Sequence, residues 1–197
     1  MSIDTSAFKK NMPIETDRLT ISFLDHSDIS WYKEEIIKPY YLKYLDAKEK
    51  MLKNAKSVAP KLTALAFAYK HGLPETQIRL IARDKKTNEV YGGITIFDLK
   101  QDTKTIELGY WIKPEFQGNG YATEMINAIY NFIEANFKNC IGIVLEIQVV
   151  NTQSVKLAER CGFRENGRRN GKYCTNVIYS KYFTNRGEQD ANQIYYI

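Results

Sequence analysis

Several segments of the chain alternate apolar with polar residues, which is the period of a half-buried β-strand. The segments with this pattern are residues 17–24, 77–83, 91–99, 105–112 and 175–183, and the apolar run 141–150 predicts one more strand. The polar residues 85–89 separate the second strand from the third, which predicts a hairpin turn between them.

Other segments repeat apolar residues every three or four positions, which predicts amphipathic helices. Ser27 and Asp28 are candidate N-caps for a first helix that ends before Pro39. Further helices are predicted at residues 40–55, 60–69, 122–137 and 153–160. Gly162 is well placed to follow the last of these helices in the left-handed conformation that ends many helices.

The predicted order is one strand, helices, three strands in hairpin succession, then helix, strand, helix and strand. Hairpins followed by strand–helix–strand units indicate an α/β fold with a mixed, mostly antiparallel central sheet and helices on both faces. A chain of 197 residues fits one domain, with its core at about residues 15–183 and a polar tail at 184–197. Residues 164–172 are expected to form a solvated loop.

Composition narrows the class of protein. The chain is 44% hydrophobic and 26% charged, as soluble proteins commonly are. It has no apolar run near the roughly 20 residues that span a bilayer, and no basic-then-apolar start typical of a secretory signal. Its three cysteines form no CxxC pair and it has two histidines, so we expect reduced thiols, no metal site and a cytoplasmic location.

The net charge of +5 favours an anionic ligand without identifying it. Basic residues are spread along the chain, and the densest stretch, residues 164–172, is interrupted by Glu165 and by Asn and Gly residues. That stretch lacks interleaved aromatic residues and a recognisable reading helix, so nucleic-acid binding is disfavoured.

The connection between residues 112 and 124 carries the clearest chemical signal. A predicted strand ends at Ile112, two glycines follow at Gly118 and Gly120, and a predicted helix begins near Gly120. Glycines let the backbone approach a ligand closely, and the first amides of a helix have no internal partners. Such a junction is suited to bind a pyrophosphate.

Two standard phosphate motifs do not fit this connection. No Lys-Ser/Thr pair follows the second glycine, and the third small residue of a dinucleotide-binding fingerprint is missing. Asn119-Gly120 also favours a tight hairpin turn, but the helical pattern that follows argues against a simple strand reversal.

The run from Gln117 to Ala122 (QGNGYA) resembles the coenzyme A signature of the GNAT N-acetyltransferase superfamily, Gln/Arg-x-x-Gly-x-Gly/Ala. The preceding Ile112-Lys-Pro114 is similar to the usual lead-in, and Asn151 with Gly162-Phe163 resembles the second conserved block. The segment ETDRL at residues 15–19 resembles the opening of the RimJ/RimL branch. These motifs occur in the family's order.

This resemblance implies acetyl-CoA as cosubstrate, with no metal. The backbone from Gln117 to Ala122 and the Thr123 hydroxyl would bind its pyrophosphate; this loop comprises Gln117, Gly118, Asn119, Gly120, Tyr121 and Ala122. Backbone groups of Tyr110, Trp111 and Ile112 would hold the pantetheine arm in the manner of an added strand. The Asn151 side chain would contact the same arm, and it is equally suited to cap the helix that follows.

One residue departs from the family pattern. Many GNAT enzymes place a Tyr, the usual proton donor, seven residues after the Asn, where this chain has Ala158. Ser154 occupies the position where the RimJ/RimL branch often has a Ser suggested to serve the thiol. Glu107, on the strand leading to the glycine loop, would act as the base; the alternative is an exposed strand position.

The predicted function is therefore transfer of an acetyl group from acetyl-CoA to a primary amine by direct attack in a ternary complex. The acceptor would be a protein N-terminus or a small amine, in a pocket that Tyr40, Tyr41, Tyr110 and Trp111 could line. Because Ala158 replaces the usual Tyr, a non-catalytic coenzyme A-binding module is the alternative. Either a monomer or a homodimer is compatible with the sequence.

Overall fold

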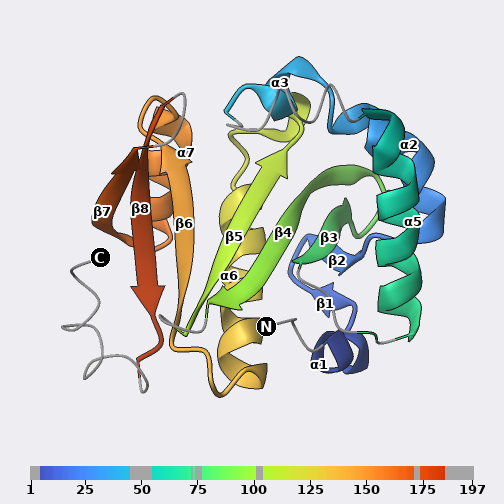
Figure 1. The fold of residues 1–197 in the computed structure, drawn as a ribbon, viewed down its shortest axis with the longest axis horizontal. Helices are drawn as coiled ribbons and strands as arrows, with labels where there is room; N and C mark the ends of the chain where they lie inside the picture. Colours follow the sequence, from blue (N-terminus) through green and yellow to red (C-terminus); the bar gives the residue numbers. More distant parts are fainter. Residues whose placement is uncertain are drawn as a thin grey trace.

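The computed structural model describes residues 5–44, 55–71, 73, 77–100, 104–170 and 174–184. They form an eight-stranded sheet in the order β1-β2-β3-β4-β5-β6-β8-β7 (Figure 1). The strands are β1 Ile14–Glu15, β2 Leu19–Phe23, β3 Gln77–Asp84, β4 Val90–Lys100, β5 Thr105–Ile112, β6 Gly142–Gln148, β7 Arg164–Asn170 and β8 Thr175–Tyr182. The helices are α1 Thr5–Lys10, α2 Ile29–Glu35, α3 Pro39–Leu42, α5 Ala55–His71, α6 Tyr121–Asn136 and α7 Thr152–Arg160, with 3₁₀ turns η1 His26–Asp28 and η2 Pro114–Phe116.

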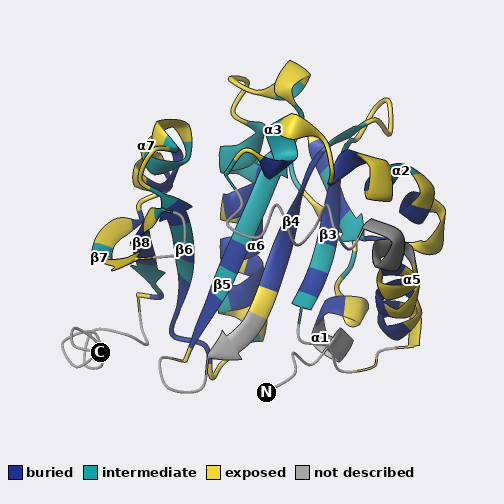
Figure 2. Ribbon diagram, turned by 45° about the horizontal axis from the view of Figure 1, so that its top comes forward, coloured by how far each residue is buried: buried dark blue, intermediate teal, exposed yellow. Residues whose placement is uncertain are grey.

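Strand alternation on β3 divides the core between the two faces of the sheet. Leu80 and Ala82 belong to the larger apolar cluster, which contains the buried side of α6. Ile81 points the other way and packs with residues of α2 and α5. Figure 2 shows these buried faces in dark blue on the strands and on the inner sides of the helices. The predicted mixed α/β sheet with helices on both faces is confirmed.

All six predicted strands are present. The expectation of a loop at 164–172 was wrong. Residues Arg164–Asn170 form β7, which pairs with β8 at the edge of the sheet. Nearly every side chain of β7 is exposed, so the strand lacks the alternation that marks a half-buried one. Charged residues are common on edge strands, where they discourage pairing with other chains.

The helical regions differ in detail from their predictions. The short elements α1 and β1 were not predicted, and α5 begins at Ala55 and contains Pro60 rather than starting there. Pro39 opens α3, in the first helical position that proline tolerates. The rest of the helix predicted at 40–55, from residue 45 to 54, lies outside the described residues, as does the tail from 185 onward.

The central strands β5 and β6 pair in parallel over a short stretch only. Their ladder joins Thr105 to Gly142 and ends where Glu107 pairs with Val144. Beyond that point β5 stays with β4 and β6 stays with β8, so the two strands diverge as they run on (Figure 1). All residues from 104 to 170 are described, and no further pair between these strands occurs among them.

Candidate functional site

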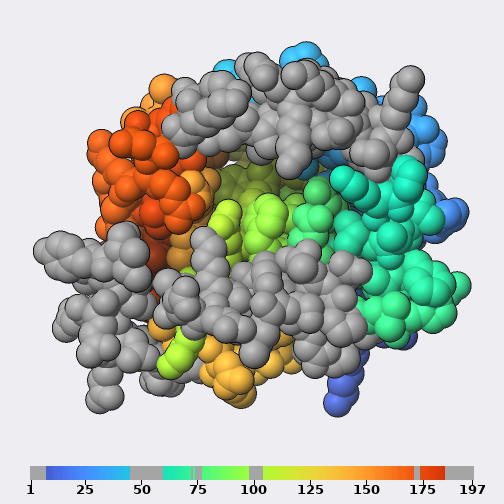
Figure 3. Space-filling model, viewed as in Figure 1, coloured from blue at the N-terminus to red at the C-terminus, as the bar shows by residue number. Residues whose placement is uncertain are grey.

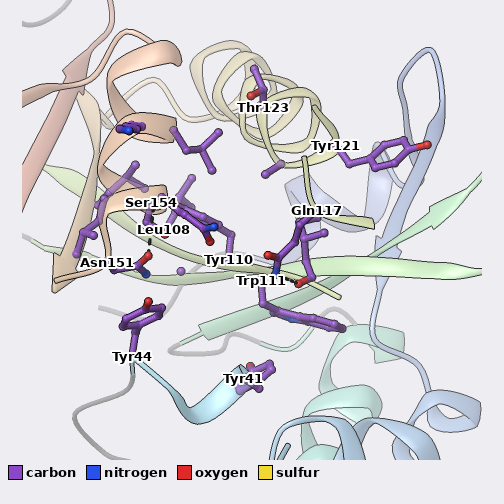
Figure 4. A pocket seen from close by; sticks show the side chains of 18 of the residues that line it. Tyr41, Tyr44, Leu108, Tyr110, Trp111, Gln117, Tyr121, Thr123, Asn151 and Ser154 are labelled. Carbon is purple, nitrogen blue, oxygen red and sulfur yellow. Dashed lines mark hydrogen bonds between the residues drawn. The ribbon is translucent and has the colours of Figure 1, made fainter. Parts of the chain in front are cut away.

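A cavity of about 880 Å³ occupies the space between the diverging strands. Its walls come from residues 108–112 of β5, residues 145–148 of β6, the glycine loop before α6, and α7. Figure 3 shows this face of the molecule hollowed over β4 and β5. Figure 4 shows side chains from β5, α7, α3 and the glycine loop converging on the cavity. The cavity therefore extends from the edge of β5 to the glycine loop before α6.

The glycine loop has the backbone that its sequence predicted. Gly118 and Gly120 have φ angles of 80° and 82°, in the left-handed region that glycine adopts without steric cost. Gly120 is the N-cap residue of α6, so the unpaired amides of the first helical turn lie beside the cavity. A Cβ atom on Gly118 would meet no atom within 4 Å, which leaves room for a ligand at the loop.

Side chains within the loop hold it in place. Gln117 donates a 3.0 Å hydrogen bond from Nε2 to the carbonyl of Ile112, the last residue of β5. Asn119 donates from Nδ2 to the carbonyls of Phe116 and Gln117. Asn119 is absent from the cavity lining, so the structure assigns it to bracing the loop, whereas Gln117 lines the cavity.

The segment ETDRL fastens the start of α6. Glu124, in the first turn of α6, accepts hydrogen bonds from the Thr16 hydroxyl at 2.5 Å and from Nε of Arg18 at 2.6 Å. Arg18 also donates to the Asn119 carbonyl at 3.0 Å and lies 4.3 Å from the centre of the Tyr121 ring. Burial alone would raise the pKa of Glu124, but the bonds from Thr16 and Arg18 lower it, so the carboxylate stays ionised.

Helix α7 brings its first turn to the cavity. The Asn151 side chain accepts a 3.3 Å hydrogen bond from the amide of Ser154, so it caps α7. Asn151 and Ser154 both line the cavity, and Figure 4 places them together on one side of it. Lys156 and Arg160 line it as well and give this wall a positive charge.

The position of the missing Tyr does not face the cavity. Ala158 is fully buried in the main apolar cluster, and it is not a lining residue. A Tyr side chain there would have to displace core side chains, because protein interiors are close-packed. Position 158 therefore belongs to the core of this chain and not to the cavity wall.

Tyr110 brings a phenol to the cavity from the sheet instead. Its hydroxyl is buried and has no hydrogen-bond partner of standard geometry among the described residues. Burial raises the pKa of Tyr110 to about 12, while the Ser154 hydroxyl acts in the opposite direction. The phenol is thus protonated near neutral pH and close to Ser154, with a proton available for hydrogen bonding.

The two carboxylates near the gap differ in position. Glu107 lies in the last paired row of β5 and β6 and does not line the cavity, so the structure does not bring it together with Ser154. Glu146, on β6, does line the cavity. Its two carboxylate oxygens accept hydrogen bonds of 2.9 Å from Arg169 and Asn176.

Aromatic residues and one arginine form the far end of the cavity. Tyr40, Tyr41 and Trp111 line it, as predicted, and Tyr41 lies 5.5 Å from Trp111 between ring centres. Arg79 of β3 also lines it. Its Nε is the other buried polar side-chain atom, besides the Tyr110 hydroxyl, that lacks a partner among the described residues.

Most of the predicted residues meet at this cavity. The predicted residues that line it are Tyr110, Trp111, Ile112, Gln117, Gly118, Gly120, Tyr121, Ala122, Thr123, Asn151 and Ser154. Sequence reasoning missed Arg79, Glu146, Lys156 and Arg160. Arg79 did have a sequence signal, because it is a charged residue inside a strand that is otherwise mostly apolar. The others depend on which way β6 and α7 face, which the sequence alone does not give.

The sequence matches the profile of the acetyltransferase (GNAT) domain over residues 18–164, which is more than half of the chain. The chain belongs to the GNAT acetyltransferase family. Within the described residues of this GNAT chain, no helix is both long and apolar enough to cross a membrane. Nor do those residues form a cluster of His, Cys, Asp or Glu that could hold a metal ion.

Two curated GNAT relatives are similar in sequence over part of their length. The spermidine N(1)-acetyltransferase of Vibrio cholerae is 28% identical over 128 residues, which cover 64% of this chain and 66% of the relative. YdaF of Bacillus subtilis, provisionally named a ribosomal N-acetyltransferase, is 34% identical over 85 residues, 42% of this chain and 45% of YdaF. The chain thus spans less than two thirds of either relative.

Solved structures of GNAT proteins share the fold over a longer span. RimL, a ribosomal L7/L12 α-N-protein acetyltransferase in complex with coenzyme A, superposes with a TM-score of 0.71 at 18% identity, covering 87% of this chain and 97% of RimL. The ribosomal-protein-S5-alanine acetyltransferase of Vibrio fischeri gives a TM-score of 0.72 at 16% identity, covering 89% and 99%. At these identities the likeness establishes the fold.

Gly120→Glu should abolish coenzyme A binding, because it would place a bulky anion where the loop is suited to a pyrophosphate. Gly120→Ala is the matched control, since it shares the strain of a side chain at φ 82° without the charge. Calorimetric titration with coenzyme A should show binding to the Ala variant and none to the Glu variant, with similar losses in unfolding temperature. Equal affinity of the two variants would contradict a phosphate-binding role for the loop.

Proposed function

We propose that the protein is an N-acetyltransferase that moves the acetyl group of acetyl-CoA to a primary amine in a ternary complex. The observation that carries this proposal is the cavity between β5 and β6, which is continuous with the left-handed glycine loop at the start of α6. Family membership agrees with it. We further propose that the reaction takes place in the cytoplasm and uses no metal.

The residues present fit the parts of acetyl-CoA. The loop amides around Gly118 and Gly120 would receive the pyrophosphate at the positive end of α6. Lys156 and Arg160 add positive charge for phosphate groups on the opposite wall. The edge of β5 that leaves β6 would offer backbone hydrogen bonds to the amide groups of the pantetheine arm.

Direct transfer has a simple balance of bonds. The amine nitrogen forms a bond to the acetyl carbon, the carbon–sulfur bond breaks, the amine loses a proton and the thiolate gains one. A thiol of this kind has a pKa of about 8.5, so the thiolate leaves with modest help. The enzyme must therefore position the amine, stabilise the carbonyl oxygen and supply a proton to sulfur.

We propose that Ser154 supplies that proton and that Tyr110 supports it. The Asn151 cap fixes the first turn of α7, so the Ser154 hydroxyl is held at the cavity. The buried Tyr110 hydroxyl stays protonated and would donate toward Ser154 as Ser154 donates to sulfur. This arrangement would replace the Tyr that other GNAT enzymes carry on the helix.

The structure constrains the residue that accepts the amine proton less than it constrains the proton donor. Glu107 remains a prediction, but its position outside the cavity lining offers it no direct path to the amine. Glu146 lines the cavity across from β5 and is better placed to accept a proton, directly or through water. We propose Glu146 as the base and Glu107 as its comparison in mutagenesis.

The similar proteins suggest two acceptor classes, the polyamine spermidine and the α-amino group of a ribosomal protein. A non-catalytic coenzyme A-binding module remains the second candidate, because Ala158 removes the usual proton donor. The presence of polar groups from two elements, Ser154 and Tyr110, in the same cavity favours the enzyme.

The function is tested by release of free thiol from acetyl-CoA in the presence of amines. The panel should contain spermidine, amino acids, amino-acid amides and short peptides with free N-termini. We expect acetyl-CoA-dependent thiol release with at least one class, and mass spectrometry should show an acetylated amine. Coenzyme A binding without turnover on any amine would instead support the non-catalytic module.

Ser154→Ala should lower kcat by about 100-fold, the lower end of what proton transfer by a side chain contributes, and should leave coenzyme A affinity unchanged. Tyr110→Phe should show a smaller loss in the same parameter, since the phenol acts through Ser154. Thr152→Ala is the matched control, because Thr152 lies in the same helical turn, is exposed and does not line the cavity. A Ser154→Ala enzyme with the kcat of the Thr152→Ala enzyme would contradict the assignment.

A further inference from the structure

Arg79 is a cation whose partners in the described chain are all uncharged. Its Nη1 donates to the Tyr32 hydroxyl at 2.9 Å and its Nη2 to Oε1 of Gln77 at 3.3 Å. Its Nε is buried and has no partner among the described residues. Arginine stays protonated in proteins, so the positive charge persists and needs a counter-charge when water is displaced.

A second arginine on the same face of β3 shows the contrast. Arg83 lies four residues after Arg79 and forms an ion pair with the buried carboxylate of Asp28. Arg83 is thus neutralised within the protein. Arg79 has no such carboxylate in the described residues, and its side chain lines the cavity. The missing counter-charge can come from a ligand in that cavity.

The sheet register places Arg79 close to the proposed reaction centre. Arg79 pairs with Thr95 on β4, and Thr95 pairs with Gly109 on β5, so the three residues form one row across the sheet. With strands about 4.8 Å apart, the Cα atoms of Arg79 and Gly109 are about 10 Å apart. Gly109 belongs to the stretch of β5 along which the pantetheine arm of acetyl-CoA is proposed to lie. A ligand held by the Arg79 side chain would therefore lie within a small molecule's length of that arm.

The charges around the cavity select against a polycation. Its described lining includes Arg79, Lys156 and Arg160 but only one carboxylate, that of Glu146. Glu146 is the proposed base, and a 2.9 Å ion pair with Arg169 already offsets part of its charge. A polyamine would need several acidic partners, and the described lining offers it one carboxylate.

We propose that the acceptor is an amine that also carries a carboxylate, and that Arg79 binds this carboxylate. This inference rests on the proposed acetyltransferase function and names its acceptor class. The planar guanidinium matches a carboxylate through two parallel N–H bonds. Tyr41 and Trp111, which line the same end of the cavity, provide an apolar wall for the carbon atoms between the two groups.

The experiment compares acceptors that differ only in this charge. Each amino acid, α or ω, is assayed beside its carboxamide by thiol release, with spermidine as the polycation. Since a hydrogen-bonded charge pair lost from a binding site costs about 10- to 150-fold, kcat/KM should favour the carboxylate by that factor for the best acceptor. Spermidine should be a poor acceptor.

Variants of Arg79 test whether this side chain causes the preference for carboxylate over carboxamide acceptors. Arg79→Gln should bring the carboxylate-to-carboxamide ratio close to one, and Arg79→Lys should retain part of it. Lys156→Gln is the matched control, because it removes a positive charge from another wall of the cavity and should leave the ratio unchanged. Circular dichroism shows whether each variant is folded, because Lys156→Gln is itself expected to lower coenzyme A affinity without unfolding the protein.

A binding measurement gives a readout besides turnover. The N-acetyl form of the best acceptor should raise the unfolding temperature of the wild-type protein in the presence of coenzyme A, and its carboxamide should not. In Arg79→Gln this difference should vanish.

The outcomes distinguish failure of the proposed acceptor class from failure of the proposed acetyltransferase function. Equal use of both members of each pair, a preference for spermidine, or an unchanged ratio in Arg79→Gln overturns the inference and leaves the acetyltransferase function standing. Absence of thiol release with every amine overturns the proposed function, and the inference falls with it.

Discussion

The divergence of β5 from β6 is the constraint on which the rest of the structure depends. Two parallel neighbours that pair only as far as Glu107 and Val144 leave an edge of backbone groups facing a gap inside the sheet. Buried backbone groups need partners, so such a gap suits a ligand that supplies hydrogen bonds of its own. β4 and β8 keep both halves of the sheet ordered on either side of the gap.

The elements around the gap serve to hold its walls in place. Thr16 and Arg18, from the start of the chain, fix Glu124 and the glycine loop, so the first turn of α6 is set before any ligand arrives. Asn151 does the same for α7. Against these satisfied groups, the buried Tyr110 hydroxyl and Nε of Arg79 lack partners among the described residues. Preorganised walls with two unsatisfied polar groups are what a binding site for a polar substrate requires.

Much of the fold and of the glycine loop could be predicted from the sequence, because strand alternation and a Gly-x-Gly turn are local signals. β7 could not, since an edge strand that is polar on both faces has no alternation to read. Glu107 and Glu146 show the same limit of sequence reasoning at the site. Both lie on strands, but only the folded structure shows that Glu146, and not Glu107, lines the cavity. Arg79 has a local signal, a charge inside a mostly apolar strand, but its place at the cavity depends on pairing across three strands.

The central claim is that the gap between β5 and β6, with the glycine loop, receives coenzyme A. Amide hydrogen exchange of the wild-type protein with saturating coenzyme A, compared with adenosine, tests it most directly. The account predicts slower exchange in residues 108–112 and 117–123 with coenzyme A alone. Unchanged exchange in both segments, or protection confined to another part of the chain, would contradict it.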